Sequence, residues 1–264
     1  MTLHIIHISA LVSLIPSILA SFRRIPQRDV TFWSSLIIAI FGVAVVIFID
    51  HAAGWNKSIS SALWLTTFIC LVLHVLLSSN FEDGWRLTPL LIPYLFILGV
   101  LATAGAYSST SSLLYDASTA WMGVHIFVSV ITYGLINLAA VAALAATVQT
   151  RALKRKQMTN LSMILPSVRV SERLCVRLLT FGELFLALGL ITGMASLYAG
   201  TGELLVFDHK TSFTLLVFFI IGILLMTNYR SGTRGKAATR LVLLAYLLLT
   251  LGYPGVKVVT DIIL

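Results

Sequence analysis

Long apolar runs with few or no charged residues are the feature of this 264-residue sequence that most restricts its fold. Eight such runs can be delimited, at about residues 3–22, 30–49, 62–79, 88–107, 120–148, 178–199, 211–229 and 241–261. A helix needs about 20 apolar residues to cross the hydrocarbon core of a bilayer, and the runs are close to that length or longer. Because backbone exposed to lipid must satisfy its own hydrogen bonds, the runs predict helices.

The composition of the chain agrees with this prediction. Hydrophobic residues make up 58% of the sequence and charged residues 11%, whereas about a quarter of the residues in a soluble domain are charged. Cys70 and Cys175 lie far apart, so neither a CxxC redox site nor a covalent c-type haem attachment is supported, and we expect two unpaired thiols. We therefore predict an all-α polytopic membrane bundle of eight transmembrane helices, and not a soluble enzyme, a disordered tail or a disulfide scaffold.

The basic residues predict the orientation of these helices. Fifteen of the eighteen Lys and Arg residues fall in the connections after the first, third, fifth and seventh runs, and only Lys57, Lys210 and Lys257 fall on the other side. Cytoplasmic connections carry the excess of Lys and Arg, so both termini are predicted outside, in the periplasm. The net charge of +8 is thus an orientation signal and does not indicate a nucleic-acid partner.

The longest predicted cytoplasmic connection covers about residues 149–177. It begins with the basic cluster Arg151-Ala-Leu-Lys-Arg-Lys156, and Ser171 is a candidate N-cap for a helix that continues into the sixth run. The favoured interpretation is an interfacial segment whose cations face lipid headgroups. A docking site for a cytosolic partner is the alternative.

Polar and aromatic side chains recur at every fourth residue of the fifth run. They are Trp121, His125, Ser129, Tyr133 and Asn137. Residues four apart share a helix face, and polar groups avoid lipid, so this stripe is expected to face the bundle interior. Interhelical hydrogen bonding explains Ser129, Tyr133 and Asn137. It explains His125 less completely, because an imidazole is also an axial ligand for haem iron.

The histidines are unevenly distributed over the predicted helices. His4, His7, His51, His125 and His209 lie at or near predicted outer ends. Since ligation by two histidines places one imidazole on each side of the iron, this clustering allows His125 to meet either His209 or His51. His74 lies deeper and is expected to be a satisfied hydrogen-bonding group.

Few charged residues lie within the apolar runs. Asp50, at the outer end of the second run, is predicted to be solvated, and Glu183 is expected to reach the cytoplasmic interface or a loop arginine rather than to relay protons. No signature of a hydrolase or metalloprotease occurs, so we expect no enzymatic activity. A small-solute transporter is the weakest alternative, because the sequence shows no repeat of broken helices.

Five segments together resemble a known family. They are residues 121–133 around His125; Leu165-Pro166 followed by Glu172-Arg173-Leu174; residues 207–213; residues 232–238; and residues 246–257. Their order resembles that in the cytochrome c assembly membrane proteins, the haem-handling CcmC/CcsA group, and is most similar to the YpjD branch, close to HemX. The resemblance covers about residues 60–264, which implies a six-helix domain at 60–264 preceded by two helices in residues 1–59.

The resemblance also implies a bacterial inner-membrane protein that binds haem. His125 matches the first outward haem ligand of the family, whereas the second ligand has no counterpart. The Trp-rich outward haem-binding motif is absent too, because Phe207-Asp208-His209-Lys210 stands where the family often has Trp-Asp-Pro-Lys.

From the resemblance and the predicted topology we expect a b-type haem near the outer face. His125 and His209 are the expected axial ligands, with His51 as a further candidate. Lys210 is expected to neutralise a propionate, and Trp121 and Phe207 are expected to flank the ring. The similarity to HemX implies an alternative, a regulatory or adaptor protein that acts through residues 149–177 without haem transfer.

Overall fold

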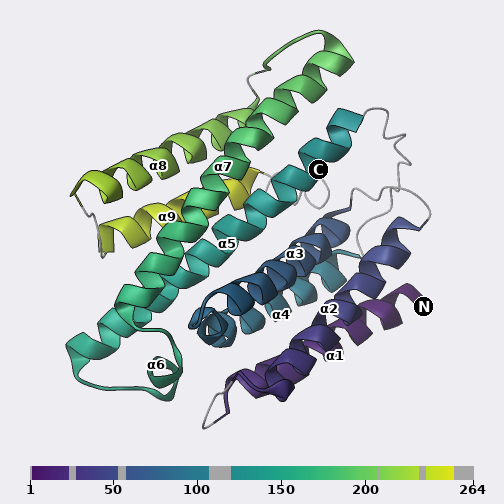
Figure 1. The fold of residues 1–264 in the computed structure, drawn as a ribbon. Coiled ribbons are helices and arrows are strands. Elements are labelled where there is room, and N and C mark those ends of the chain that lie inside the picture. Colours follow the sequence, from purple (N-terminus) through teal and green to yellow (C-terminus); the bar gives the residue numbers. More distant parts are fainter. Residues whose placement is uncertain are drawn as a thin grey trace.

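A computed structural model describes residues 2–23, 28–52, 58–106, 120–206, 208–231 and 236–252. Within these ranges the chain forms helices and no strand, which confirms the all-α prediction (Figure 1). The elements are α1 (Thr2–Ser21), α2 (Val30–His51), α3 (Ile59–Asn80), a short 3-10 helix η1 (Gly84–Leu87), α4 (Thr88–Gly105), α5 (Ala120–Arg155), α6 (Asn160–Ile164), α7 (Val168–Thr201), α8 (His209–Ser231) and α9 (Lys236–Thr250).

Six helices in the described part of the chain are long and apolar enough to cross a membrane. They are α2, α3, α4 together with η1, α5, α7 and α8. Helices α1 and α9 are also apolar, but the stretches of them that were assessed, Ile5–Ser21 and Ala238–Thr250, are shorter. Eight transmembrane helices with both termini outside therefore stay a prediction.

The helices form two groups that meet along α5. Helices α1 to α4 pack on one another, while α7, α8 and α9 lie on the other side of α5 (Figure 1). Helix α5 contacts α3 and α4 in the first group and α7 and α9 in the second. Gly134 allows the close approach to α3, because a Cβ atom at this position would lie 2.7 Å from Leu73 Cδ1.

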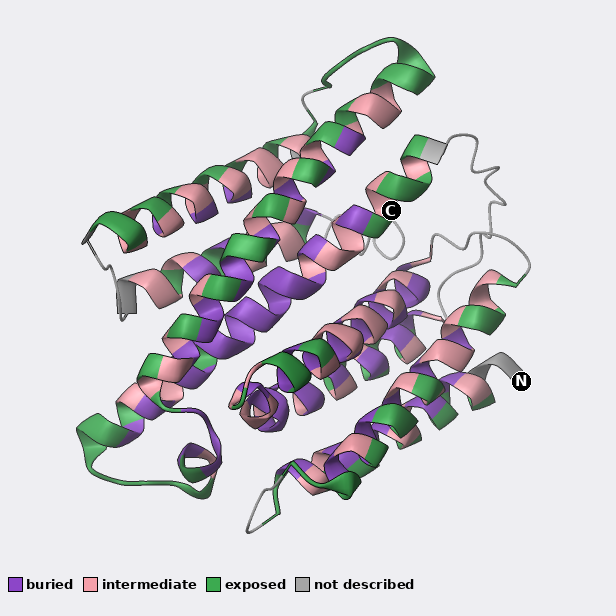
Figure 2. Ribbon diagram, in the orientation of Figure 1, coloured by how far each residue is buried: buried purple, intermediate pink, exposed green. Residues whose placement is uncertain are grey.

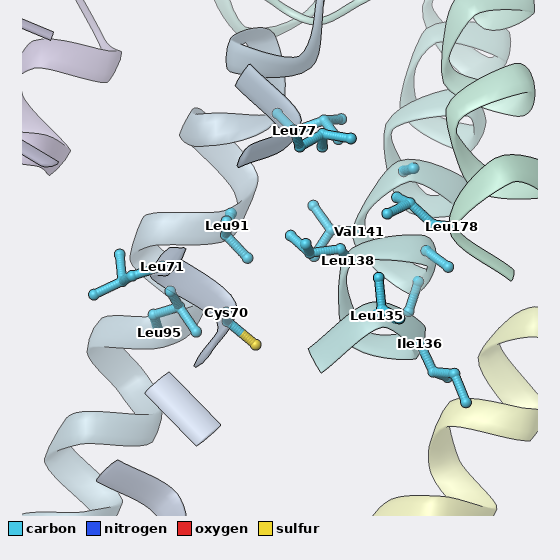
Figure 3. Packing of buried hydrophobic residues seen from close by; sticks show 14 of the residues in the cluster. Cys70, Leu71, Leu77, Leu91, Leu95, Leu135, Ile136, Leu138, Val141 and Leu178 are labelled. Atoms are coloured by element: carbon cyan, nitrogen blue, oxygen red, sulfur yellow. The ribbon is translucent and has the colours of Figure 1, made fainter. Parts of the chain in front are cut away.

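The middle of α5 is the most continuously buried part of the molecule. All residues from 134 to 143 are buried, and Figure 2 shows this stretch as an uninterrupted band. Figure 3 shows leucines of α3 and α4, Leu71, Leu77, Leu91 and Leu95, on one side and Leu135, Ile136, Leu138 and Val141 of α5 on the other. Small residues such as Ala139 and Ala142 permit close helix packing in lipid. Cys70 and Cys175 are both free and buried, which confirms the expectation of unpaired thiols.

Helices α5 and α7 are longer than a bilayer requires. They contain 36 and 34 residues, so at about 1.5 Å per residue they extend for more than about 50 Å, against about 30 Å of hydrocarbon. The segment predicted as a loop at 149–177 is accordingly shorter. Helix α5 continues to Arg155 and α7 begins at Val168, with α6 between them.

A single glutamine holds this short connection against the end of α5. The Gln149 Nε2 amide donates to the carbonyl oxygens of Ser162, Leu165 and Pro166, at 2.7, 3.0 and 3.1 Å. The side chain is buried, with 6% of its surface exposed. Because the amide satisfies carbonyls that no helix pairs, the connection is an ordered part of the fold.

The predicted N-cap of the helix after this connection is wrong by four residues. Helix α7 begins at Val168 with Ser167 in the N-cap position, so Ser171 lies inside the helix. The Ser171 hydroxyl donates instead to the Pro166 carbonyl, at 3.3 Å, and is fully buried. A serine in a first turn can hydrogen-bond backwards in this way as readily as it can cap.

Candidate functional site

His125 lies near the start of α5, with its ring against α7. Its Nδ1 atom is 3.0 Å from the Gly189 carbonyl oxygen and 3.4 Å from Thr192 Oγ1. A carbonyl only accepts, so Nδ1 carries the proton and donates to it. The lone pair of the neutral ring is then on Nε2, which has no hydrogen-bond partner in the described part of the chain. Nε2 is therefore the atom that is available to a metal.

Gly193 provides the space in which the His125 ring lies. A Cβ atom at Gly193 would be 2.9 Å from His125 Cε1 and 3.2 Å from Nδ1. Any larger residue at this position therefore has to displace the ring. The Gly189–Gly193 pair on α7 thus does two things: one glycine supplies the carbonyl acceptor, and the other leaves room for the imidazole. The sequence contains this spacing, but nothing in it indicates that His125 packs over it.

Trp121 lies one turn before His125 on the same face of α5. Half of its surface, 50%, is exposed, and its neighbours Val124 and Phe127 are exposed as well. His125 thus lies at the border between the packed α5–α7 interface and an exposed apolar surface. Such a surface can contact either acyl chains or a flat apolar ligand.

The other predicted ligands are not brought to His125 within the described residues. His209 and Lys210 begin α8, but the structure does not describe their side chains, and Phe207 lies outside the described residues. The pairing of His209 with His125, and the contacts of Lys210 and Phe207 with haem, therefore stay predictions. His51 lies between α2 and α3. Its Nδ1 donates to the Ile47 carbonyl at 2.9 Å, and its Nε2 is 3.3 Å from Ser61 Oγ.

The lower half of the stripe on α5 forms an interhelical hydrogen-bond network. Asn137 Nδ2 donates to the Tyr94 hydroxyl of α4 at 2.9 Å, and the Tyr94 and Tyr246 hydroxyls are 2.6 Å apart. The Tyr133 hydroxyl lies 3.1 Å from Thr250 Oγ1 on α9. The predicted role of Tyr133 and Asn137 in helix packing is confirmed.

The stripe nevertheless does not point in one direction. Four residues turn a helix by about 400°, so each step drifts by about 40°, and four steps carry the stripe almost to the opposite side of α5. Hence His125 faces α7, whereas Tyr133 and Asn137 face α4 and α9. Ser129 lies between these two parts and has no hydrogen bond to the described part of the chain.

Two charged residues differ from their predicted surroundings. The Asp50 side chain, expected to be solvated, is only 5% exposed, and its Oδ1 atom lies 3.6 Å from Nε2 of His7 on α1. Glu183 lies about four turns into α7, where its Oε2 atom is buried without a hydrogen-bond partner in the described part of the chain. A Cβ atom at Gly222 of α8 would lie 3.3 Å from Glu183 Oε1, so this carboxyl faces α8 and not a loop arginine.

A basic surface lies at the opposite end of α5 and α7 from His125. Its exposed cations are Arg151, Lys154, Arg155, Lys156, Arg169, Arg173 and Arg177. No ion pair joins these seven residues to a carboxylate in the described part of the chain. Leu153, Met158 and Met163 lie among them and are 60%, 56% and 60% exposed. The surface therefore combines unpaired positive charge with apolar side chains.

Comparison with known proteins gives two kinds of match. The family model described as Cytochrome C assembly protein matches residues 59–264, from the start of α3 onward. A protein of Azospirillum brasilense, the "28.8 kDa protein in nifR3-like 5'region", is 44% identical over 262 residues, which is 97% of each chain.

More distant relatives cover most of the chain as well. Inner membrane protein YpjD of Escherichia coli strain K12 is 26% identical over 217 residues, 81% of this chain and 79% of its own. The same identity and coverage hold for Inner membrane protein YpjD of Escherichia coli O6:H1. No solved structure matches this chain.

Proposed function

The chain belongs to the cytochrome C assembly protein family and is a multi-pass inner-membrane protein, and on this basis we propose that it binds a b-type haem near the outer face of the membrane. One observation carries the proposal. The Gly189 carbonyl, 3.0 Å from His125 Nδ1, holds the imidazole in the tautomer whose Nε2 can ligate iron. Haem iron is commonly held by histidine.

His125 would hold the iron, with His209 as the proposed second ligand and His51 as a weaker candidate because both of its nitrogens are engaged. Lys210 would neutralise a propionate, and Trp121, exposed on the His125 face of α5, would contact the ring. The haem would supply the iron centre, and these side chains would bind and orient it, without catalytic turnover by the protein.

Absorption spectroscopy of the detergent-purified, haem-reconstituted protein tests the proposal. We expect a Soret band that shifts on reduction and an altered band in both His125→Ala and His209→Ala, since one imidazole ligand remains in each, whereas the double variant is expected to lose the band. His51→Ala distinguishes the two candidates for the second ligand: it is expected to keep the native spectrum if His209 is that ligand, and to alter the spectrum if His51 is. Absence of a Soret band after reconstitution would contradict haem binding, as would an unchanged spectrum in the double variant His125→Ala, His209→Ala.

The proposal includes the topology. Eight transmembrane helices with both termini in the periplasm are supported by the distribution of Lys and Arg and by the apolar character of α1 and α9. Residues 1–59 then form an N-terminal helix pair and residues 60–264 the cytochrome c assembly-type domain. This division follows the family resemblance and not the packing, because α1 and α2 pack on α3 and α4.

The basic surface favours a second candidate function, a regulatory or adaptor role without haem transfer. Large apolar side chains lie among the cations, an arrangement that occurs both in segments at a membrane interface and in surfaces that bind proteins. Buried apolar contacts with a rim of charge are typical of protein interfaces. Gln149 holds the connection between α5 and α7 against the end of α5, so the basic residues of the two helices lie at the same end of the molecule.

Crosslinking in native membranes distinguishes the two functions. A variant with Arg151, Lys154, Arg155 and Lys156 replaced by Gln, and a second with Leu153 and Met163 replaced by Ser, are both expected to lose a specific crosslinked species. The His125→Ala variant is expected to keep it. If only the Gln variant has an effect, and that effect follows the content of anionic lipid, the surface binds headgroups and the adaptor role is wrong.

A further inference from the structure

A cavity lies among the four helices α5, α7, α8 and α9, and we call it the four-helix cavity. These helices pack together on one side of the molecule (Figure 1). Helix α5 contacts α7 and α9, and α8 contacts the same two helices, so the four form a closed ring. All four contribute residues to the lining of the cavity. It contains about 440 Å³ that no atom occupies, part of it open to the surroundings, a size typical of sites for small ligands.

The four-helix cavity is polar at one end and apolar at the other. Three polar side chains line the end nearer the basic surface, each within four residues of the end of its helix. They are Glu172 of α7, Asn228 of α8 and Thr239 of α9. One or two turns deeper, the lining is formed by apolar side chains such as Leu179, Leu224 and Val242. A ligand that matches this lining therefore has a polar group at one end and an apolar part behind it.

The polar end of the four-helix cavity lies near the cytoplasmic boundary of the bilayer on the proposed topology. Gly189 accepts the hydrogen bond of His125 and so lies at the level of the outer interface. Glu172 precedes Gly189 by seventeen residues, or about 26 Å of helix, against about 30 Å of hydrocarbon. From Glu172 to Leu179 the cavity then extends for about 10 Å into the cytoplasmic leaflet. It lies at the depth of lipid acyl chains, with its polar end at the level of the headgroups.

Exposed arginines lie beside the polar end, each within three residues of a polar lining residue. They are Arg169 and Arg173 of α7, Arg230 of α8 and Arg240 of α9. Arg169 lies one turn before Glu172, on the face of α7 that also carries Leu179. In the part of the chain that the structure describes, no ion pair joins these four arginines to a carboxylate. The cations outnumber the single carboxylate of Glu172, so this end of the cavity favours an anionic group.

We propose that the four-helix cavity binds one anionic phospholipid of the cytoplasmic leaflet. One acyl chain lies along the apolar lining, and the phosphate accepts hydrogen bonds from the guanidinium groups of Arg169 and Arg173. A free anion would leave the apolar lining without a partner, and a neutral lipid would leave the arginines without a counter-charge. Basic pockets between transmembrane helices on the cytoplasmic side are typical sites for anionic headgroups.

Native mass spectrometry of the full chain, delipidated in detergent and titrated with either phosphatidylglycerol or phosphatidylcholine, tests the proposal. We expect the first phosphatidylglycerol to bind more tightly than later ones and more tightly than phosphatidylcholine. The double variant Arg169→Gln, Arg173→Gln is expected to bind this first lipid about 30-fold more weakly, the typical effect of removing two basic residues from an anionic lipid surface.

The matched control for this variant is Lys154→Gln, Lys156→Gln, which removes the same charge from the tip of α5 and is expected to leave the first lipid bound as in the native chain. Equal losses in the two double variants would mean that net charge alone attracts lipid, and would overturn the site. Equal binding of phosphatidylglycerol and phosphatidylcholine, or the lack of a tight first lipid, would overturn it as well.

A second pair of variants tests whether an acyl chain occupies the cavity. Ala143 and Ala146 line it from α5, so Ala143→Leu and Ala146→Leu are each expected to fill it and to lose the tight first lipid. Ala199→Leu, at an exposed position near the other end of α7, is the control and is expected to keep it. Elution volume and helix content show that each variant is folded.

Inorganic phosphate distinguishes a lipid from a free anion. At the concentration of the lipid it is expected not to displace the first phosphatidylglycerol, because it has no chain to fill the apolar lining. Displacement by phosphate, or native binding in the two alanine variants, would mean that the chain lies outside the cavity and that the proposal is wrong. In detergent the result does not depend on the orientation of the protein, and the Soret band assigned to His125 is expected to persist in all these variants, so the two proposals fail independently.

Discussion

A Gly193→Val variant is expected to bind haem about 10- to 100-fold more weakly than the native chain, the range found when a group that orients a metal ligand is lost. The Cβ atom of any residue at position 193 would lie 2.9 Å from His125 Cε1. Valine adds two methyl groups beyond that atom, so the ring has to move away from α7. This movement breaks the 3.0 Å hydrogen bond from Nδ1 to the Gly189 carbonyl, which fixes the tautomer. Haem titration followed by the Soret band measures the change.

Gly200→Val provides the matched control for this prediction. Gly200 lies on the same helix, and a Cβ atom there meets nothing within 4 Å. The Gly200→Val variant is therefore expected to leave haem affinity unchanged. Gly193→Ala should lie between the two, because its Cβ atom alone requires a smaller shift of the ring. Equal haem affinities of Gly193→Val and the native chain would mean that the contact of the His125 ring with α7 does not orient the imidazole for haem binding. Elution volume and helix content show whether each variant is folded.

Tyr94→Phe is expected to lower the free energy of unfolding by about 1 to 2 kcal/mol, the sum of two interhelical hydrogen bonds at typical values for membrane proteins. The substitution leaves the Asn137 amide without its acceptor at 2.9 Å, and the Tyr246 hydroxyl without its partner at 2.6 Å. Asn137 is 1% exposed, so water cannot replace the lost acceptor without entering the core. Unfolding in mixed detergent and lipid micelles, followed by loss of helix, measures the effect.

The coupling between the two tyrosines can be separated from the loss of a hydroxyl. Tyr198→Phe, at a position that is 57% exposed, is the control and should change stability little. In a double-mutant cycle, Tyr94→Phe and Tyr246→Phe are expected to cost less together than the sum of the single changes. Additive effects would show that the network does not join α4 to α9 energetically.

The helices and most of their ends could be predicted from the sequence, but the end of α5 and the start of α7 could not. An apolar run marks only the part of a helix that crosses the hydrocarbon, so the run at 120–148 stops before α5 ends at Arg155, and the run at 178–199 starts after α7 begins at Val168. Outside the hydrocarbon a helix continues with charged residues of good helix propensity, such as Lys154 and Arg155, and hydropathy no longer marks it. The ordered connection depends on Gln149, whose three acceptors are far from it in sequence.

The site could be predicted in part, because a stripe on one helix is a local property. His125 and Trp121 follow from the four-residue spacing, and the resemblance to the family indicates haem. The surface of α7 that His125 contacts could not be predicted in this way, because it lies far from His125 in the sequence. That Gly189 accepts from His125 depends on the register between α5 and α7, and the sequence of either helix alone leaves this register open.

Asp50 illustrates the remaining error. Position at the end of an apolar run predicts solvation, because such ends usually meet water. In the structure α1 covers this end of α2, and His7 lies opposite the carboxyl. Whether the Asp50 side chain is solvated or buried depends on how α1 packs against α2. Helix α1 contains no Asp, Glu, Lys or Arg, so its sequence does not indicate a charged partner for Asp50.

The length of α5 determines how strongly anionic lipid headgroups can attract the basic surface. If His125 lies at the predicted outer interface, the thirty residues to Arg155 extend for about 45 Å, so an upright helix would place its tip about 15 Å beyond the opposite hydrocarbon boundary. The Debye length at physiological ionic strength is about 8 Å, so attraction to anionic headgroups is largely screened at Lys154 and Arg155. Arg177 stacks on Phe81 at the end of α3, 5.1 Å from the ring centroid, a position nearer the bilayer on the predicted topology. That topology grades the cations by height, from those within electrostatic range of the leaflet to those that only a molecule arriving from the cytosol would meet.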